Sequence, residues 1–276
     1  MTLPLQNIGK VNNKGFELCL GYKKHTNNSN LFYADFNVGY SKNKILYNAE
    51  VIKPFEYQNR SGRMIDQPFV LESIGFFNDQ EEINNSPKQV FETVKPGDIK
   101  YKDQNNDGII DQNDFYPCGF TYIPEVNFGF STGFKYKNVD FDIFFQGALN
   151  RTVYLSGKNY HAFQNNGKIT GLAKARWTPE TSEVATYPRL SAHNNNNNYQ
   201  YSSFWQKNGN FLKLRDLEFG YSLSKSIVHK IGIQNVRFYI VGSNIFSLDE
   251  LKISDPEKLS GYPAMKSFSL GTNIQF

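Results

Sequence analysis

The stretch that decides the fold is Ser267 to Phe276, which reads Ser-Phe-Ser-Leu-Gly-Thr-Asn-Ile-Gln-Phe. Successive side chains of an extended strand point to opposite faces. One face therefore carries Phe268, Leu270, Ile274 and Phe276, whereas the other carries only small or polar residues. A strand of about ten residues with one apolar and one polar face suits a membrane-spanning β-barrel. A single strand of this kind is more often part of an ordinary β-sandwich. The two folds are therefore distinguished by how often the pattern recurs along the chain.

The same alternation recurs in six further stretches of the chain. They are 14–24, 32–41, 126–136, 139–146, 211–223 and 236–246. The first two form an expected hairpin around a polar turn, Lys137-Asn138 is the turn of another, and 224–234 predicts a short helical turn. The sequence thus predicts an all-β fold with an antiparallel sheet, and specifically part of a transmembrane barrel of about seven or eight strands.

Composition agrees with this class and excludes others. The chain has 24 Phe and 17 Tyr among its 276 residues, which fits β-strands and the aromatic girdles of a barrel. The net charge of +4 is spread along the chain, so no nucleic-acid partner is expected. No apolar run reaches about eighteen residues, which excludes a transmembrane helix. Cys19 and Cys118 show no metal-site spacing, and their pairing is left open.

Connection lengths alternate strictly between short and long. Short joins lie near 25–30, 137–138 and 224–234, and long segments lie at 49–125, 156–208 and 249–266. Outer-membrane barrels have short periplasmic turns and long extracellular loops, so the long segments are expected to be extracellular. Seven strands is an odd number, whereas single-chain barrels close with an even one. Either the 49–125 segment hides a further strand, for which 67–77 is a candidate, or the chain is the C-terminal part of a longer barrel. The lack of a recognisable signal peptide favours the second alternative. A loop insert must contribute an even number of crossings, so 67–77 is assigned to an extracellular hairpin.

Residues 103–114 form the most specific motif. A Ca²⁺ loop presents oxygen ligands at positions 1, 3, 5, 7, 9 and 12, with Gly at position 6. The corresponding residues here are Asp103, Asn105, Asp107, Ile109, Asp111 and Asp114, with Gly108 at the turn. Position 12 is Asp114 in place of the usual Glu. Its shorter side chain reaches less far toward the ion, which predicts weak Ca²⁺ binding. The alternative is a polar turn that binds nothing.

Other candidate sites are less specific. Tyr160, Trp177, Tyr199 and Trp205 give the 156–208 segment an aromatic character suited to stacking on a substrate, and equally suited to a loop core or a partner interface. The run 194–198 reads as a flexible low-complexity loop. The four histidines are scattered, and no nucleophile or acid/base pair has a readable spacing, so no enzymatic activity is predicted.

Several landmarks, in order, resemble those of SusC/RagA-type TonB-dependent outer-membrane transporters. They are 7–17 (Asn-Ile-Gly-Lys onward), 96–111 (Pro-Gly-Asp-Ile onward), 141–147, Arg176-Trp-Thr-Pro179, Tyr187-Pro-Arg-Leu190, 210–221 and 241–246. The resemblance spans nearly the whole chain, residues 1–276, and corresponds to the C-terminal part of such a transporter. The family's signal peptide, plug domain and TonB-contacting segment have no counterpart in this stretch.

The resemblance implies an outer-membrane importer of oligosaccharides or peptides, which works with a SusD-like surface lipoprotein and is energised by TonB through the missing N-terminal part. Under it, Phe268, Leu270, Ile274 and Phe276 become the candidate C-terminal assembly signal of the barrel, facing outer-membrane lipid. The competing hypothesis is a secreted, soluble, calcium-stabilised carbohydrate-binding β-sandwich. The sequence does not identify the substrate.

Overall fold

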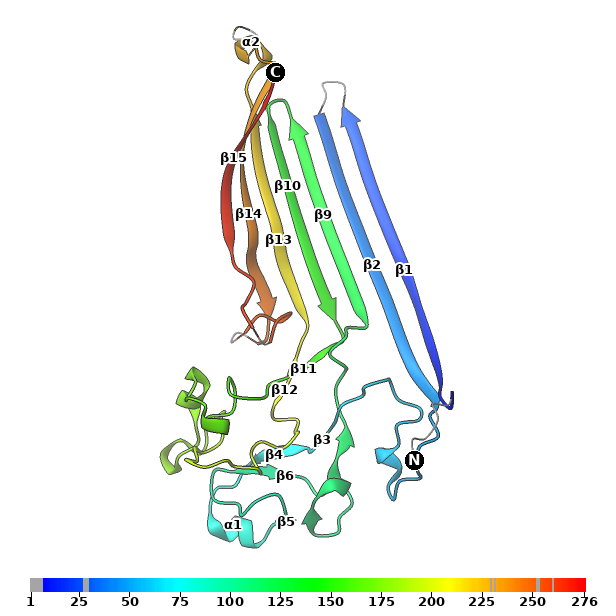
Figure 1. Ribbon diagram of the computed structural model, residues 1–276, viewed down its shortest axis with the longest axis vertical. Coiled ribbons are helices and arrows are strands. Elements are labelled where there is room, and N and C mark those ends of the chain that lie inside the picture. The colour runs from blue at the N-terminus through cyan, green and yellow to red at the C-terminus, as the bar shows by residue number, and fades with distance from the viewer. Residues whose placement is uncertain (1–6, 27–29, 229, 231, 252–253, 260) are drawn as a thin grey trace, which may run out of the picture. The chain divides into compact units, whose positions relative to one another are not determined.

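A seven-stranded antiparallel sheet is the main element of one of the two units of the structure (Figure 1). The structure is a computed structural model that describes residues 7–26, 30–228, 230, 232–251, 254–259 and 261–276. It divides into a sheet unit, residues 13–42, 122–151 and 208–276, and a loop unit, residues 7–12, 43–121 and 152–207. The strands of the sheet are β1 (Lys10–Thr26), β2 (Asn30–Tyr47), β9 (Val126–Tyr136), β10 (Val139–Leu149), β13 (Phe211–Ser222), β14 (Asn235–Asp249) and β15 (Ser267–Gln275).

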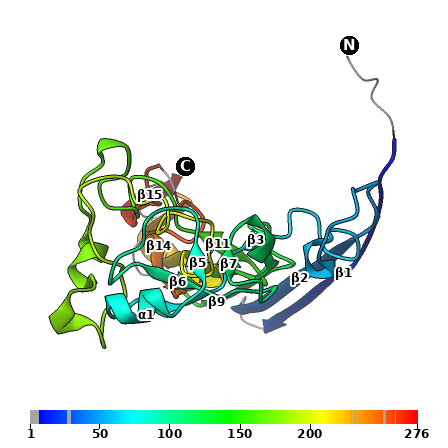
Figure 2. The ribbon, with the colours of Figure 1, turned by 90° about the horizontal axis from the view of Figure 1, so that it is seen from below.

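The sheet is hydrogen-bonded in the order β1-β2-β9-β10-β13-β14-β15. Each stretch predicted from alternation matches one of these strands, although 211–223 and 267–276 extend one residue beyond β13 and β15. The pairs whose register is defined are antiparallel. The prediction of an all-β chain with a large antiparallel sheet is confirmed. Figure 2, seen along the strands, has β1 and β15 at opposite borders of the sheet. These two strands are not neighbours in the described sheet, which is therefore open.

The predicted short joins are found where the structure describes them. Tyr136 pairs with Val139 across a two-residue turn, in which Lys137 has a φ of 52°. A left-handed residue is what a tight hairpin turn requires, because its twist matches that of the strands. The helical turn between β13 and β14 is α2 (Lys225–Val228). The turn expected between β1 and β2 falls mostly on residues 27–29, which lie outside the described residues.

One face of the sheet is apolar and open. Phe268 and Leu270 on β15 expose 72% and 80% of their surface, and Phe276 beyond the strand exposes 83%. The outward positions of the other strands are also exposed, among them Phe16, Leu18, Leu20, Tyr22, Phe32, Phe130, Phe134, Phe219, Tyr221, Phe238 and Ile240. A contiguous apolar face of this extent is unusual on a soluble monomer and marks a surface that another phase or partner covers.

The opposite face is polar and closely networked. Arg237 on β14 is paired with Asp140 on β10 and Glu218 on β13, so one guanidinium joins three neighbouring strands. The hydroxyl of Tyr33 on β2 donates a hydrogen bond to the carboxylate of Asp142 on β10, across the intervening strand β9. Both arrangements need glycine between the partners, because a Cβ at Gly133 or Gly220 would collide with these side chains. Small residues on this face therefore make room for the polar network.

Replacing Arg237 by Met should lower the free energy of unfolding by about 1–2 kcal/mol, because two partly buried carboxylates lose their charged partner and solvent screens the rest. The measurement is the urea unfolding midpoint of the folded protein in detergent. The matched control is Lys135→Met, which removes an exposed cation from the same face. Equal midpoints for the two variants would contradict the role given to Arg237.

The loop unit is made of short elements. Its strands are β3 (Phe69–Val70), β4 (Ser73–Phe76), β5 (Lys88–Gln89), β6 (Ile99–Tyr101), β7 (Ile109–Ile110), β8 (Tyr116–Pro117), β11 (Thr152–Tyr154) and β12 (Gln206–Asn208, whose last residue belongs to the sheet unit). Its helical turns are η1 (Glu56–Gln58), α1 (Gln80–Asn84), η2 (Gln112–Asp114), η3 (Gln164–Asn166), η4 (Gly171–Ala175) and η5 (Pro179–Thr181). Within the described residues, no helix is long and apolar enough to cross a membrane.

Stretch 67–77, which was assigned to a hairpin, forms two short strands, β3 and β4. Strand β3 pairs with β8 and β4 pairs with β6, so the two halves of this stretch bind partners from further along the chain. The two long segments predicted as separate loops also fold together. Leu71 exchanges backbone hydrogen bonds with Tyr201 and Ser203, which joins the first segment to the second. Their shared core includes Val70, Leu71, Phe77, Ile99, Tyr101, Ile110 and Val153.

Candidate functional site

The centre of the loop unit is a fully buried carboxylate, Asp98. It forms an ion pair with Arg189 at 2.8 Å and accepts hydrogen bonds from the side-chain amides of Asn195, at 2.8 Å, and Asn198, at 2.9 Å. The backbone N–H of Lys95 donates to the same carboxylate at 2.7 Å. A charge buried this deeply is stable only when it is paired and fully hydrogen-bonded, so these contacts fix the two long segments against each other.

Three of the sequence landmarks meet at this carboxylate. The Pro96-Gly97-Asp98 landmark supplies the acid, and Tyr187-Pro188-Arg189-Leu190 supplies the base. The ring of Trp177, from the third landmark, lies so close to Gly97 that a Cβ there would overlap it. Gly97 also has a φ of 86°, a conformation open mainly to glycine. Three of the seven landmarks that carried the resemblance are therefore parts of one packed cluster.

The prediction of a flexible loop at 194–198 is wrong. Asn195, Asn197 and Asn198 are 3%, 0% and 1% exposed. The side chain of Asn197 accepts a hydrogen bond from Gln89 and donates one to the carbonyl of Ile99, and Asn198 accepts one from the N–H of Ile99. Amides can satisfy the backbone of irregular structure in a core where no strand is long enough to do so.

Three of the four aromatic residues predicted to contact substrate lie in this core. Tyr160, Trp177 and Trp205 are 6%, 7% and 2% exposed, and Tyr199 is partly buried. His161 stacks on Tyr199 and packs against Trp205, and burial lowers the pKa of its imidazole. The indole N–H of Trp205 donates to the carbonyl of Asn198 at 2.7 Å. The structure gives these rings a packing role, and their contact with substrate stays a prediction.

The carboxylates of the predicted calcium loop are engaged by the loop's own backbone. Asp103 accepts from the N–H groups of Asn106 and Gly108, at 2.7 and 2.8 Å. Asp114 is buried and accepts from Gln104 and Asp111, and burial raises its pKa. No group of three or more His, Cys, Asp or Glu within the described part of the chain is placed to hold a metal ion. The donors are of the right type but do not converge as folded.

The remaining predicted site residues have simple placements. Phe268, Leu270, Ile274 and Phe276 all lie exposed on the apolar face of the sheet or at its end. Cys19, which is exposed, and Cys118, which is partly buried, are both free thiols.

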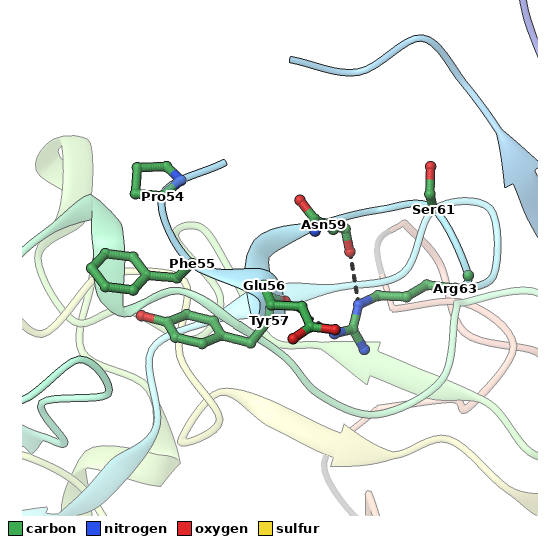
Figure 3. A pocket seen from close by; sticks show the side chains of 8 residues that line it. Pro54, Phe55, Glu56, Tyr57, Asn59, Ser61 and Arg63 are labelled. Atoms are coloured by element: carbon green, nitrogen blue, oxygen red, sulfur yellow. Dashed lines mark hydrogen bonds between the residues drawn. The ribbon is translucent and has the colours of Figure 1, made fainter. Parts of the chain in front are cut away.

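Two hollows in the loop unit were not predicted. One, of about 720 Å³, is lined by residues 54–57, 59 and 61–63 (Figure 3). In it Phe55 and Tyr57 stack with ring centroids 5.5 Å apart, and Arg63 donates to the carbonyls of Asn59 and Tyr57. The other, of about 800 Å³, lies beside α1 over Ile83, Val90 and Phe91. Nothing in their sequence spacing distinguishes these stretches from ordinary polar loops.

Comparison with known proteins identifies the relatives of this chain. No family model matches it. TonB-dependent receptor P26 of Formosa agariphila is 28% identical over 308 residues, covering 99% of this chain, and TonB-dependent receptor SusC of Bacteroides thetaiotaomicron is 26% identical over 287 residues, covering 98%. The chain is a relative of the SusC-type TonB-dependent receptors. It spans 30% and 27% of the length of these two relatives.

Solved structures share the fold of this chain. The RagAB peptide transporter superposes with a TM-score of 0.72 at 19% identity, and the open-open state of the RagAB peptide importer with 0.69 at 20% identity. Each comparison covers 98% of this chain, and 30% or 29% of the solved chain. The sequence relatives, which cover 99% and 98% of this chain, confirm the family resemblance read from the landmarks.

Asp98→Asn should destabilise the loop unit by about 3–5 kcal/mol, because it leaves the guanidinium of Arg189 partly buried without its countercharge. Thermal unfolding followed by near-ultraviolet circular dichroism, which reports the packed rings of Trp177 and Trp205, measures the change. Glu81→Gln in α1 is the control, since Glu81 is exposed. Unchanged melting of the Asp98 variant would show that the buried ion pair does not hold the unit together.

Proposed function

We propose that the sheet forms consecutive strands of an outer-membrane β-barrel. The observation that carries the proposal is the open sheet itself, which is apolar and exposed on one face and ion-paired on the other. Lipid covers the first face and water fills the space beside the second, as in known barrels. Strands β9 and β10, with 11 residues each, match the hydrocarbon thickness for a tilted strand.

The barrel closes through strands beyond those described here. Strands β1 and β15 each have one unpaired edge, and an exposed edge in lipid leaves backbone groups without hydrogen bonds. Because this chain spans only 30% and 27% of the length of these relatives, they have room for the strands that would pair with both edges. The final strand, with Phe268, Leu270, Ile274 and Phe276, would then serve as the assembly signal.

The activity we propose is TonB-dependent import of a nutrient across the outer membrane. The support is the relationship to TonB-dependent receptors and the fold shared with a peptide importer. The substrate class is an oligosaccharide or a peptide, and the partner is a SusD-like surface lipoprotein docked on the long extracellular segments. An enzyme is not proposed, since the relatives are named as receptors.

The soluble sandwich is the weaker hypothesis. A sandwich needs a second sheet packed on the apolar face. In the sheet unit, the outward side chains of the described strands remain exposed, and the short strands of the loop unit pair among themselves. A soluble sandwich would have to bury Phe268 and Leu270, which are among the most exposed large side chains described.

Leu270→Arg should impair assembly into the outer membrane, because an arginine on the lipid face costs about 2–4 kcal/mol near the bilayer midplane. Ser269→Arg is the matched control, one residue away on the polar face, and should assemble normally. The measurement is the heat-modifiable folded band in outer-membrane fractions. Equal assembly of both variants, or a greater loss for Ser269→Arg, would contradict the orientation proposed here.

We further propose that residues 103–114 bind Ca²⁺ weakly. The support is the donor spacing, since an ionised carboxylate keeps lone pairs beyond those that accept backbone hydrogen bonds. Calcium at about ten times its dissociation constant should stabilise the loop unit by about 1.4 kcal/mol. Asp103→Asn with Asp107→Asn should abolish this gain while keeping most backbone contacts. No thermal shift of the unmodified protein at millimolar Ca²⁺ would rule out the site.

A further inference from the structure

Strands β1 and β2 each carry a lysine just beyond the apolar run of the exposed face. The even positions are apolar from 16 to 22 on β1 and from 32 to 40 on β2. The next even position at one end of each run is Lys14 on β1 and Lys42 on β2. Because side chains alternate between the two faces of a strand, both lysines belong to the apolar face. Both are exposed, and both lie in the sheet unit.

Close contacts between the two strands define how they pair. Strands β1 and β2 are neighbours in the sheet (Figure 1). A Cβ placed on Gly15 would lie 3.1 Å from the Cα of Ser41, and one placed on Gly21 would lie 2.8 Å from the Asp35 side chain. The residue numbers therefore run in opposite directions, and Gly15 lies beside Ser41 in an antiparallel pair.

This register places the two lysines opposite each other. Lys14 precedes Gly15 and Lys42 follows Ser41, so the two face each other across the strands. The next pair on the same face agrees, because the rings of Phe16 and Tyr40 have centroids 5.8 Å apart. Like charges directly opposite each other destabilise a strand pair. Among the described residues, neither lysine forms an ion pair that would offset this repulsion.

The spacing of charges along β1 matches the thickness of a membrane. Lys14 and Lys24 bracket the apolar run on the same face, ten residues apart. At about 3.3 Å per residue they are about 33 Å apart along the strand. A strand tilt of about 40° reduces this to about 25 Å along the membrane normal, which is the height of the apolar band of an outer-membrane barrel. The two ends of the run therefore coincide with the two head-group layers.

Under the proposed function, Lys14 and Lys42 lie at the outer head-group layer. Strand β2 leads from Lys42 toward the long 49–125 segment, which is expected to be extracellular, whereas Lys24 precedes the short join between β1 and β2. Opposed side chains of an antiparallel pair have Cβ atoms about 5 Å apart, so two lysine ammonium groups there can bind one phosphate between them. A bound phosphate would remove the repulsion between the lysines.

The surroundings of the two lysines favour a lipid over a free anion. Phe16 and Tyr40 lie next to them on the same face, and the Phe16 side chain is 58% exposed. Acyl chains attached to the phosphate would cover these rings, whereas a free phosphate would leave them bare. A substrate inside the barrel would meet the polar face, to which neither lysine belongs.

We propose that Lys14 and Lys42 bind the phosphate of a glycolipid in the outer leaflet, whose acyl chains lie along the apolar face over Phe16 and Tyr40. The inference rests on the proposed function, because that function places this face in lipid. The paired lysines and their position at the end of the apolar run rest on the structure alone.

The test is native mass spectrometry of the protein purified from outer membranes in detergent and titrated with bisphosphorylated lipid A. Lys14→Gln with Lys42→Gln should weaken binding about 25-fold, since each basic residue at an anionic membrane surface contributes about fivefold. Two controls should bind as the parent does. Lys24→Gln neutralises the same face at its other end, and Lys23→Gln neutralises the polar face. Equal affinity of the double variant and the parent would overturn the proposal.

Two further ligands separate a lipid site from an ion site. Excess inorganic phosphate should leave lipid A bound, because it cannot cover the apolar face. An uncharged galactolipid should bind the parent and the double variant equally. Displacement of lipid A by inorganic phosphate would overturn the assignment to a lipid. A parent that binds neither lipid would contradict the proposed function as well, whereas galactolipid binding with no effect of the double variant on lipid A would overturn the lysine site alone.

A charge-retaining variant separates loss of charge from loss of structure. Lys14→Arg with Lys42→Arg should keep the parent's affinity for lipid A, and its failure to do so in a folded protein would overturn the proposal. In detergent without lipid, the glutamine variant should melt at or above the temperature of the parent, because like-charge repulsion is removed. A lower melting temperature would contradict the opposed placement of the two charges.

Discussion

A single antiparallel sheet has two faces, and this chain supplies polar partners for only one of them. Period-two alternation places Arg237, Asp140 and Glu218 on the polar face, where ion pairs tie three strands together. The same alternation puts phenylalanine, leucine and tyrosine on the other face, which the described strands leave exposed. Water is a poor solvent for that face, and the proposal that lipid covers it accounts for its exposure.

The core of the loop unit is stabilised in a different way. Its strands are only two to four residues long, too short for backbone ladders to satisfy a core. Asp98, Arg189 and a group of buried asparagines supply the missing hydrogen bonds, and aromatic rings fill the volume around them. Such a network is specific because each member is paired, and removal of one leaves the others buried without partners. Such packing gives the loop unit a defined surface.

The sequence predicts the sheet well because the information is local. Alternation along 126–136 or 267–276 is visible within ten residues, and Lys137-Asn138 marks its own turn. The loop unit is harder, because its contacts join residues about a hundred positions apart, as Asp98 and Asn198 are. An asparagine run is usually solvated, and nothing in its composition indicates that its side chains bind a buried carboxylate, that of Asp98. The landmarks did mark Asp98 and Arg189, without giving the reason for them.

The ion pairs between the turn at residues 254–259 and strand β13 were missed for the same reason. Asp255 and Glu257 read as ordinary loop acids, and Lys213 reads as a charge on a wet strand face. Only the return of the chain onto β13 brings the three groups together and covers the lysine. Single-sequence reasoning finds which face a side chain occupies, but it does not find which loop folds over that face.

The most direct measurement of the central claim is a spin-label scan of β9, one residue at a time from Val126 to Tyr136, in outer-membrane vesicles. The account predicts that collision with oxygen peaks at the even positions, such as Phe128 and Phe134, and collision with a water-soluble nickel chelate peaks at the odd ones, such as Gly129 and Ser131. Nickel accessibility at the even positions equal to that at the odd positions, or shielding of the even positions from both reagents, would contradict a lipid-facing sheet.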